Sequence, residues 1–158
     1  MKNKKNILII GGTGFIGSHL ANKCLKEMKV IIISRKKILK EKKNKSIKYL
    51  NFDISNKKNF TKLNNYKIDY VVNCGGNVNH FKKKETYKSH FIGVKNLFEY
   101  FNKKNIKKFI QIGSSSEYGK IPSPQKEIKL GKPKMIYGKS KMKASKFLLK
   151  KFKINNFP

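Results

Sequence analysis

Residues 6–17 read Asn6-Ile-Leu-Ile-Ile10-Gly11-Gly-Thr-Gly14-Phe-Ile-Gly17, and this stretch decides the fold class of the 158-residue chain. Asn6–Ile10 is a short, nearly continuous apolar run, which is typical of a buried strand in a parallel sheet. Helical spacing of apolar residues begins at Phe15, directly after the glycines, and continues to Glu27. The segment therefore predicts a strand, a tight glycine turn and a helix in direct succession.

Outward from this segment, apolar runs alternate with segments of helical period. Strands are predicted at residues 30–33, 47–52, 69–73 and 108–112. Helices are predicted at residues 55–63, with Ser55 as the N-cap, and at residues 87–101 and 136–152. This alternation indicates an α/β protein, a Rossmann-type doubly wound parallel sheet with helices on both faces.

The glycine turn has the context that dinucleotide binding requires, because a strand runs straight into it and a helix follows at once. Gly11 permits the tight turn, Gly14 lets the backbone approach a pyrophosphate, and Gly17 lets the helix pack close to the strand. The unpaired N–H groups at the start of the helix would face the phosphates. We expect residues 1–158 to form one NAD(P)-binding domain, with cofactor contacts in the turn from Gly11, Thr13, Gly14, Phe15, Ile16 and Gly17.

The second predicted strand ends in Ser34-Arg35-Lys36-Lys37, which contains no acidic residue. An NAD site usually has Asp or Glu here to bind the ribose 2′-hydroxyl. Arg35, the only arginine of the chain, stands where the 2′-phosphate of NADP would lie, so the sequence favours NADP over NAD. The alternative is that Arg35 stacks on the adenine or faces solvent. Asp53 and Ile54 follow the third strand, and Asp53 is placed either to bind the adenine amino group or to cap a turn.

Tyr137 and Lys141 are four residues apart in the last predicted helix and share one of its faces. A free tyrosine is a poor base at neutral pH because its pKa is near 10, and a neighbouring ammonium favours the phenolate. Tyr137 is thus a candidate to take a proton from a hydroxyl while hydride leaves the same carbon. Ser114 and Ser115 follow the fifth strand, at the sheet edge where ligands bind, and either hydroxyl is a candidate to share the substrate oxygen.

Together these residues resemble the extended short-chain dehydrogenase/reductase superfamily, in particular its NAD-dependent epimerase/dehydratase branch, which acts on nucleotide sugars. The resemblance covers nearly the whole chain and is carried by Gly11–Gly17, Asp53, Val71–Gly76, Gly93 with Asn96, Gly113–Gly119, Glu127, Pro133 and Tyr137–Lys141. It implies that Tyr137 is the acid/base, Lys141 its partner and ribose ligand, and Ser115 or Ser114 the donor to the substrate oxygen. It also implies that Gly75 and Gly76 pass close to the cofactor.

The activity implied by the resemblance is hydride transfer at a sugar carbon of a nucleotide sugar, by 4-epimerisation, 4,6-dehydration or 4-keto reduction. An NADP preference tilts the choice toward reduction, because reductases consume the cofactor whereas epimerases recycle it. Glu117 fits both the acid of dehydratases and the pattern of some 4-ketosugar reductases. His90 stands where most relatives have Asn, and it is either a packed or solvated side chain or part of the site.

Relatives continue through a sixth strand and a smaller substrate domain, whereas this chain reaches Pro158 where that strand should begin. We therefore expect a fold truncated before the sixth strand and the substrate domain, with this chain as the cofactor-binding portion. The alternative is a non-catalytic dinucleotide-binding module or a truncated remnant. The resemblance also implies a homodimer formed through the helices near residues 87–101 and 136–152.

Composition narrows the remaining classes of function. The formal net charge is +31, but all of the 39 basic residues except Arg35 are lysines. This bias, with abundant Ile and Asn, matches A/T-rich codons, so no specific nucleic-acid partner is expected. No apolar run reaches the roughly 18 residues of a membrane span. Cys24 and Cys74 are 50 residues apart without a CxxC pattern, so neither a disulfide framework nor a metal site is expected, and a reducing cytoplasm fits best.

Overall fold

The computed structural model of the chain describes residues 4–39, 41, 43–77, 79, 81–126 and 131–158. Its helices and strands follow the predicted alternation. In chain order they are β1 (Asn6–Ile10), α1 (Phe15–Cys24), β2 (Lys29–Ser34), β3 (Ile47–Asn51), the 3₁₀ helix η2 (Lys57–Leu63), β4 (Tyr70–Asn73), α2 (Lys83–Tyr87), the π-helical turn η3 (Lys88–Ile92), α3 (Gly93–Phe101), β5 (Lys108–Gln111), the 3₁₀ turn η4 (Ser115–Glu117) and α4 (Ile136–Asn155).

The five strands form one parallel sheet in the order β3-β2-β1-β4-β5. β1 is the central strand and pairs on one side with β2 and on the other with β4, so that Ile7 lies opposite both Val30 and Tyr70. The strand order reverses between β1 and β4. In doubly wound sheets, ligands bind in the crevice beyond the carboxyl ends of the strands at this switch point. The predicted fold class is confirmed.

Helices cover both faces of the sheet, and the side chains of β1 alternate between them. Ile7 and Ile9 pack in the core that includes Ala21 of α1. Leu8 and Ile10 point the other way, into the core that includes Leu97 of α3 and several buried aromatic rings. A strand buried on both faces must be apolar at every position, which explains the unbroken run of residues 7–10.

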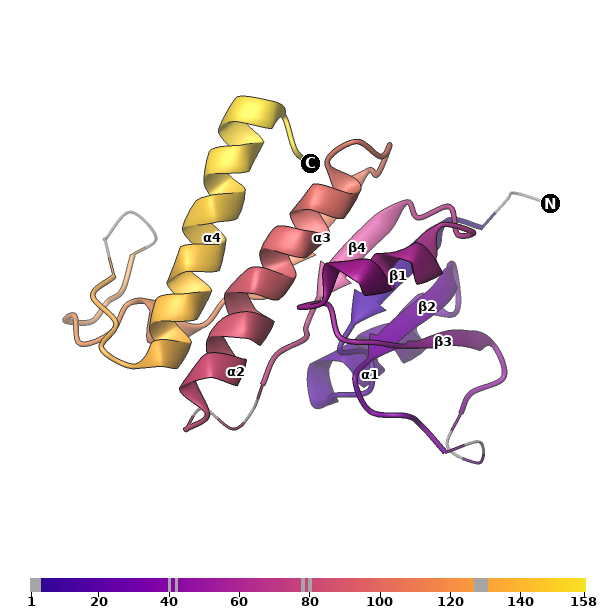
Figure 1. Cartoon of the computed structure of the whole chain (residues 1–158), viewed down its shortest axis with the longest axis horizontal. Helices are drawn as coiled ribbons and strands as arrows, with labels where there is room; N and C mark the ends of the chain where they lie inside the picture. Colours follow the sequence, from indigo (N-terminus) through magenta and orange to yellow (C-terminus); the bar gives the residue numbers. More distant parts are fainter. Residues whose placement is uncertain (1–3, 40, 42, 78, 80, 127–130) are drawn as a thin grey trace.

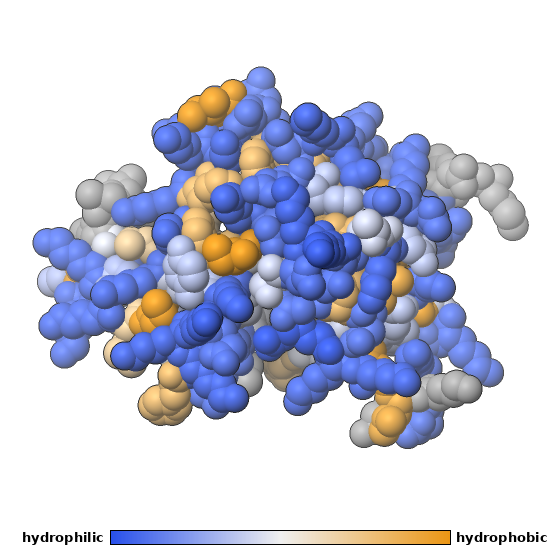
Figure 2. Space-filling view, viewed as in Figure 1, coloured by the Kyte–Doolittle hydropathy of each residue, from blue (hydrophilic) through white to orange (hydrophobic). Residues whose placement is uncertain are grey.

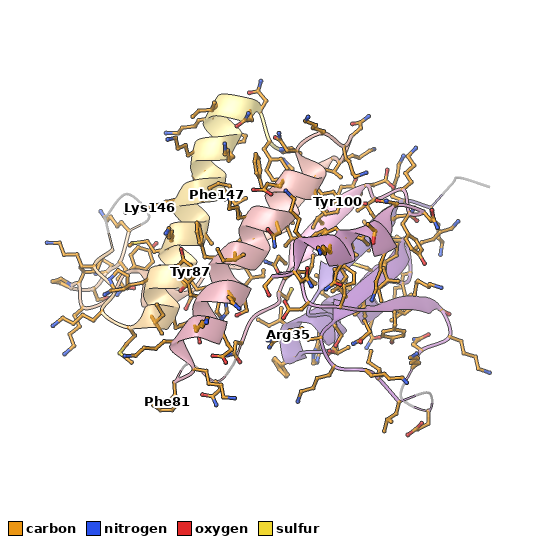
Figure 3. The ribbon with its side chains drawn as sticks, viewed as in Figure 1. Arg35, Phe81, Tyr87, Tyr100, Lys146 and Phe147 are labelled. Atoms are coloured by element: carbon orange, nitrogen blue, oxygen red, sulfur yellow. The ribbon has the colours of Figure 1, made fainter. Side chains whose placement is uncertain are left out.

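Helix α4 runs beside α3 (Figure 1), and both helices pack side chains into the core on this face of the sheet. The ring of Phe147, on α4, lies 5.3 Å from Phe98 and 6.1 Å from Phe91, both edge to face. Figure 3 shows Phe147 pointing from α4 toward α3. This aromatic contact anchors the helix whose first turn carries Tyr137.

Three local features differ from the sequence-based predictions. Ser55 does not cap the helix after β3; Asn56 does, through a side-chain oxygen that accepts from the N–H of Lys58. The helix expected from Tyr87 already begins at Lys83, and the π-helical turn interrupts it. Helix α4 continues to Asn155 and ends at Asn156, which adopts a left-handed conformation with φ of 50°.

The surface reflects the lysine-rich composition. Figure 2 shows a predominantly hydrophilic face on which apolar residues form separate small patches. Among the described helices, none combines the length and apolar composition needed to cross a bilayer. Glu127, one of the residues on which the family resemblance rests, lies outside the described residues.

Candidate active site

A pocket of about 390 Å³ opens beyond the carboxyl ends of β1 to β4, at the switch point of the sheet. This volume falls within the range of small-molecule and cofactor sites, roughly 300–1,000 Å³. Its walls come from the ends of β1, β2, β3 and β4, from the segments that follow them, and from Ser89. The lining includes all the predicted cofactor contacts except Lys141, namely Gly11, Thr13, Gly14, Phe15, Ile16, Gly17, Arg35, Asp53, Ile54, Gly75 and Gly76.

The glycine turn is held by contacts between backbones. Gly11 has φ of +71°, a conformation that side chains disfavour, and a Cβ built on it would lie 2.7 Å from the Cα of Gly75. A Cβ on Gly17 would overlap the carbonyl oxygen of Gly11, so α1 packs tightly on the turn as predicted. Gly14 differs, because a Cβ there would meet only the Gly11 oxygen, at 3.3 Å. The fold itself therefore restricts the residue at position 14 less than those at positions 11 and 17.

The N-terminus of α1 faces this pocket with its positive end uncompensated. Gly14 is the N-cap and supplies no side-chain cap, and the first turn contains no acidic residue. The N–H groups of the first turn have no partner within the helix. Phe15 is 83% exposed, so apolar burial does not explain its place at the pocket. Such a helix end is suited to an anion such as a diphosphate.

Polar side chains from β2 and from the turn after it form the rim. Thr13 donates its hydroxyl hydrogen to the Ser34 hydroxyl at 3.2 Å, and Ser34 donates to the Lys36 carbonyl at 2.9 Å. Arg35 is exposed and reaches across to the Gly76 carbonyl oxygen, 3.4 Å from its Nη2. In the view of Figure 3, Arg35 lies between the sheet and α2. Arg35 therefore lines the pocket and is also exposed to solvent.

Asp53 takes one of the two roles that the spacing left open, that of capping a turn. Its Oδ1 accepts from the N–H of Ser55 at 2.7 Å, so the carboxylate does cap the turn after β3. Asp53 also lines the pocket, opposite the glycine turn. Contact with an adenine amino group stays a prediction.

The two candidate serines after β5 lie in different environments. Ser114 is the N-cap of η4: its hydroxyl accepts from the N–H of Ser116 at 3.2 Å, and its own N–H donates to the Glu117 carboxylate at 2.8 Å. Ser115 is exposed. The Ser114 hydroxyl accepts a hydrogen bond in the turn and keeps its own O–H to donate, so the two serines differ in exposure rather than in the ability to donate.

Lys141 is only 6% exposed, although it is a lysine in a helix. Its ammonium donates to the carbonyl oxygen of Ile112, just after β5. Burial lowers the pKa of Lys141 from its ordinary value of 10.5, while the carboxylate of Glu117 and the thiolate form of Cys74 act in the opposite direction. Burial also raises the pKa of the Cys74 thiol, against the effect of the Lys141 charge. The fold therefore holds the amino group of Lys141 at the edge of the sheet.

Tyr137 lies in the first turn of α4, next to the serine turn. A Cβ on its neighbour Gly138 would overlap the carbonyl oxygen of Ser116, so the helix and the turn are in direct backbone contact. Tyr137 itself lines a second hollow of about 390 Å³ with Ser116 and Met135. Its ring stands edge to face against His90, with 5.0 Å between the centroids.

The structure thus gathers the predicted residues into two adjoining groups. The cofactor contacts line one pocket, and Tyr137, Lys141 and the serine turn lie beside it at the end of β5. Cys74, which sequence reasoning did not select, lines the pocket and also interacts with the charge of Lys141. Its position directly after β4 was the available signal. Among the described residues, no group of three or more His, Cys, Asp or Glu is placed to hold a metal ion.

This arrangement agrees with the sequence match to a family model, described as the NAD dependent epimerase/dehydratase family, over residues 7–153. The chain belongs to this family. Among curated relatives of this epimerase/dehydratase chain, the uncharacterized protein MJ1055 of Methanocaldococcus jannaschii is 31% identical in an alignment of 159 positions that covers 87% of this chain and 48% of that protein. A dTDP-6-deoxy-L-talose 4-dehydrogenase (NAD(P)(+)) of Kitasatospora kifunensis is 26% identical in an alignment of 151 positions that covers 91% of this chain and 46% of that protein.

Solved structures share the fold. The UDP-glucose 4-epimerase of Thermotoga maritima, crystallised with UDP-glucose, superposes with a TM-score of 0.87 at 24% identity, over 96% of this chain and 52% of that one. The Bordetella bronchiseptica enzyme WbmG in complex with NAD gives a TM-score of 0.85 at 19% identity, over 94% and 50%. The epimerase/dehydratase chain described here spans about half the length of the relatives it matches.

The buried Lys141 predicts a pH dependence of stability. Because its pKa is lower in the folded chain, the unfolded chain binds more protons just below pH 10.5. Stability therefore rises with pH in that interval. The free energy of unfolding is measured by urea denaturation from pH 8 upward. The difference between the wild type and Lys141→Met should shift in favour of the wild type as the pH approaches 10.5. Lys146→Met, at an exposed position of α4, is the control and should show no such gain. A constant difference between wild type and Lys141→Met would contradict the prediction.

Proposed function

We propose that this chain is the dinucleotide-binding portion of an NAD(P)-dependent enzyme that transfers hydride at a sugar carbon of a nucleotide sugar. The observation that carries the proposal is the adjacency of two groups: an uncapped helix N-terminus in a pocket at the switch point, and Tyr137 with the buried Lys141 beside it. A dinucleotide fits the first group, and acid/base chemistry on a hydroxyl fits the second. Family membership and the kinds of enzyme among the relatives support this combination.

The described residues fit the cofactor part by part. The absence of a side chain at Gly14 and the N–H groups of the first turn of α1 suit the pyrophosphate. Arg35 would meet the 2′-phosphate of NADP, because it lies on the pocket rim and no acidic residue occurs at the end of β2. Asp53 would bind the adenine amino group from the opposite wall. We therefore propose NADP as the preferred cofactor.

The bound dinucleotide would supply the hydride acceptor or donor at its nicotinamide ring. Residues of the chain would transfer the proton that accompanies the hydride. Tyr137 would remove the proton from the substrate hydroxyl as the carbon is oxidised, and return it when the carbonyl is reduced. The ammonium of Lys141 would favour the phenolate, and the exposed hydroxyl of Ser115 would donate to the same substrate oxygen. Glu117 would keep Lys141 charged despite its burial.

Among the candidate reactions, we favour reduction or oxidation at carbon 4 of the sugar. The basic rim at Arg35 suits NADP, which reductases consume. The Kitasatospora kifunensis relative is a 4-dehydrogenase that uses NAD(P)(+). Epimerisation and dehydration at the same residues are the alternatives.

Gly14→Val tests the cofactor position. The new Cβ would meet only the Gly11 carbonyl oxygen, at 3.3 Å, so a small local shift should accommodate it and the fold should survive while the pyrophosphate site is filled. We expect NADPH affinity to fall by at least about 100-fold, since close backbone approach to the phosphates is lost. Fluorescence titration measures the affinity, and the thermal unfolding profile should stay close to that of the wild type. Normal NADPH binding by this variant would show that the pyrophosphate lies elsewhere.

Arg35→Ser tests the choice between the two cofactors. A charge-assisted hydrogen bond to the 2′-phosphate contributes about 1.5–3 kcal/mol, which corresponds to roughly 10- to 100-fold in affinity. NADPH binding should weaken by that factor and NADH binding should change little, both measured by titration calorimetry. Lys37→Ser is the matched control. Equal losses for NADPH and NADH would mean that Arg35 contacts a part common to both.

Tyr137→Phe tests the chemistry in the full-length protein. Removal of a positioned acid/base group should lower turnover of sugar nucleotides by about 10²- to 10⁴-fold. NADPH affinity should stay within about threefold, because Tyr137 does not line the dinucleotide pocket. Stopped-flow absorbance at the nicotinamide band follows the reaction. Undiminished turnover would exclude Tyr137 as the acid/base, and NADPH binding without any turnover by the wild type would favour a non-catalytic binding module.

A further inference from the structure

His90 lies at the centre of an irregular turn in the helix layer. The residues Lys88–Ile92 form a π-helical turn between α2 and α3, and π-helical turns are frequent at functional sites. The imidazole is 6% exposed, so it is a packed side chain. It is also part of the site, because it touches elements from both groups of residues described above.

On one side, the imidazole lies against the backbone that follows β4. Its Nε2 is 3.2 Å from both the amide nitrogen and the carbonyl oxygen of Asn77. Either tautomer therefore finds a partner there: an unprotonated Nε2 accepts from the N–H, and a protonated one donates to the carbonyl. A Cβ on Gly76 would overlap the imidazole, so the ring fills the space that this glycine leaves. Because Gly75 and Gly76 line the dinucleotide pocket, His90 backs directly onto its wall.

On the other side, the imidazole meets Tyr137. The two rings are 5.0 Å apart at an interplanar angle of 79°, the edge-to-face arrangement that aromatic pairs favour. Tyr137 belongs to α4, which also packs on the helix layer through Ala144 against Val94 and through the Lys143 ammonium, 2.8 Å from the Tyr87 hydroxyl. Through His90, the first turn of α4 is connected to the backbone after β4.

We infer that His90 is a positioning residue that fixes the phenol of Tyr137 relative to the wall of the dinucleotide pocket. The inference rests on the proposed function, because it matters only if Tyr137 acts beside a bound dinucleotide. Both contacts are needed. The hydrogen bond to Asn77 fixes the position of the His90 imidazole. The contact between the imidazole and the phenol ring then fixes the position of Tyr137. A displacement of about 1 Å between reacting groups can lower turnover by about 10²-fold.

Two substitutions separate the two contacts. His90→Gln keeps a group able to bind the Asn77 backbone but removes the ring, and His90→Phe keeps a ring but removes the hydrogen bond. Phe91→Leu is the matched control, because Phe91 is buried in the same turn and its ring contacts Tyr87 and Phe147. All variants are compared with the wild type by thermal unfolding.

The spectroscopic test uses protein with isotope-labelled tyrosine rings. The chain has seven tyrosines, and the Tyr137 signal is identified by its loss in Tyr137→Phe. In His90→Gln the ring signals of Tyr137 should move toward those of an exposed tyrosine. In His90→Phe they should stay shifted, but the change that NADPH causes in the wild type should shrink. Phe91→Leu should preserve both the shift and the NADPH response.

In the full-length protein, the turnover number of both His90 variants should fall by about 10- to 100-fold, while the dissociation constant of NADPH stays within about threefold. Tyr137 signals and an NADPH response that are the same in His90→Gln as in the wild type would overturn the inference. If the wild type does not bind NADPH, the proposed function fails. The comparison without NADPH would still decide whether His90 positions Tyr137.

Discussion

The backbone contact between Gly11 and Gly75 constrains the rest of the site, because it determines how the chain leaves the two central strands. Neighbouring strands of a sheet lie about 4.8 Å apart. Two turns that leave such strands at the same edge have room for backbone only, as the 2.7 Å between a Cβ on Gly11 and the Cα of Gly75 shows. With both positions held by glycine, the turn after β1 can double back tightly and start α1 at the mouth of the crevice. The pocket, its uncapped helix end and the approach of Gly76 to His90 all follow from this geometry.

The selectivity of the site for anionic ligands depends more on where individual charges lie than on the total charge of +31. A high positive charge attracts anions of every kind and gives no selectivity by itself. In the pocket, the start of α1 carries no acidic residue, and Arg35 stands on the rim. At the end of β5, the buried Lys141 binds a backbone carbonyl, and Glu117 opposes the lowering of its pKa by burial. These two positive regions suit two different tasks, the binding of phosphate groups and the stabilisation of a phenolate.

The differences between expectation and structure have local physical causes. Ser55 follows Asp53, whose carboxylate binds the N–H of Ser55, so the helix begins one residue later with Asn56 as its cap. The π-helical turn at Lys88–Ile92 has no signature in a pattern of helical period, because only one residue is added to the turn. Ser114 and Ser115 look alike in sequence. Only the position of the Glu117 carboxylate, which closes a capping box on Ser114, separates them.

The sequence by itself determined the sheet, the glycine turn and the place of the pocket. These depend on short-range patterns: apolar runs that must be buried on both faces, and glycines between a strand and a helix. Tertiary structure alone decided which residues that are far apart in the sequence come into contact. It brought His90 against both Asn77 and Tyr137, and it placed Cys74 near Lys141. The physical reason is that such contacts depend on how helices pack on the sheet, and that packing is a property of the whole core rather than of any one segment.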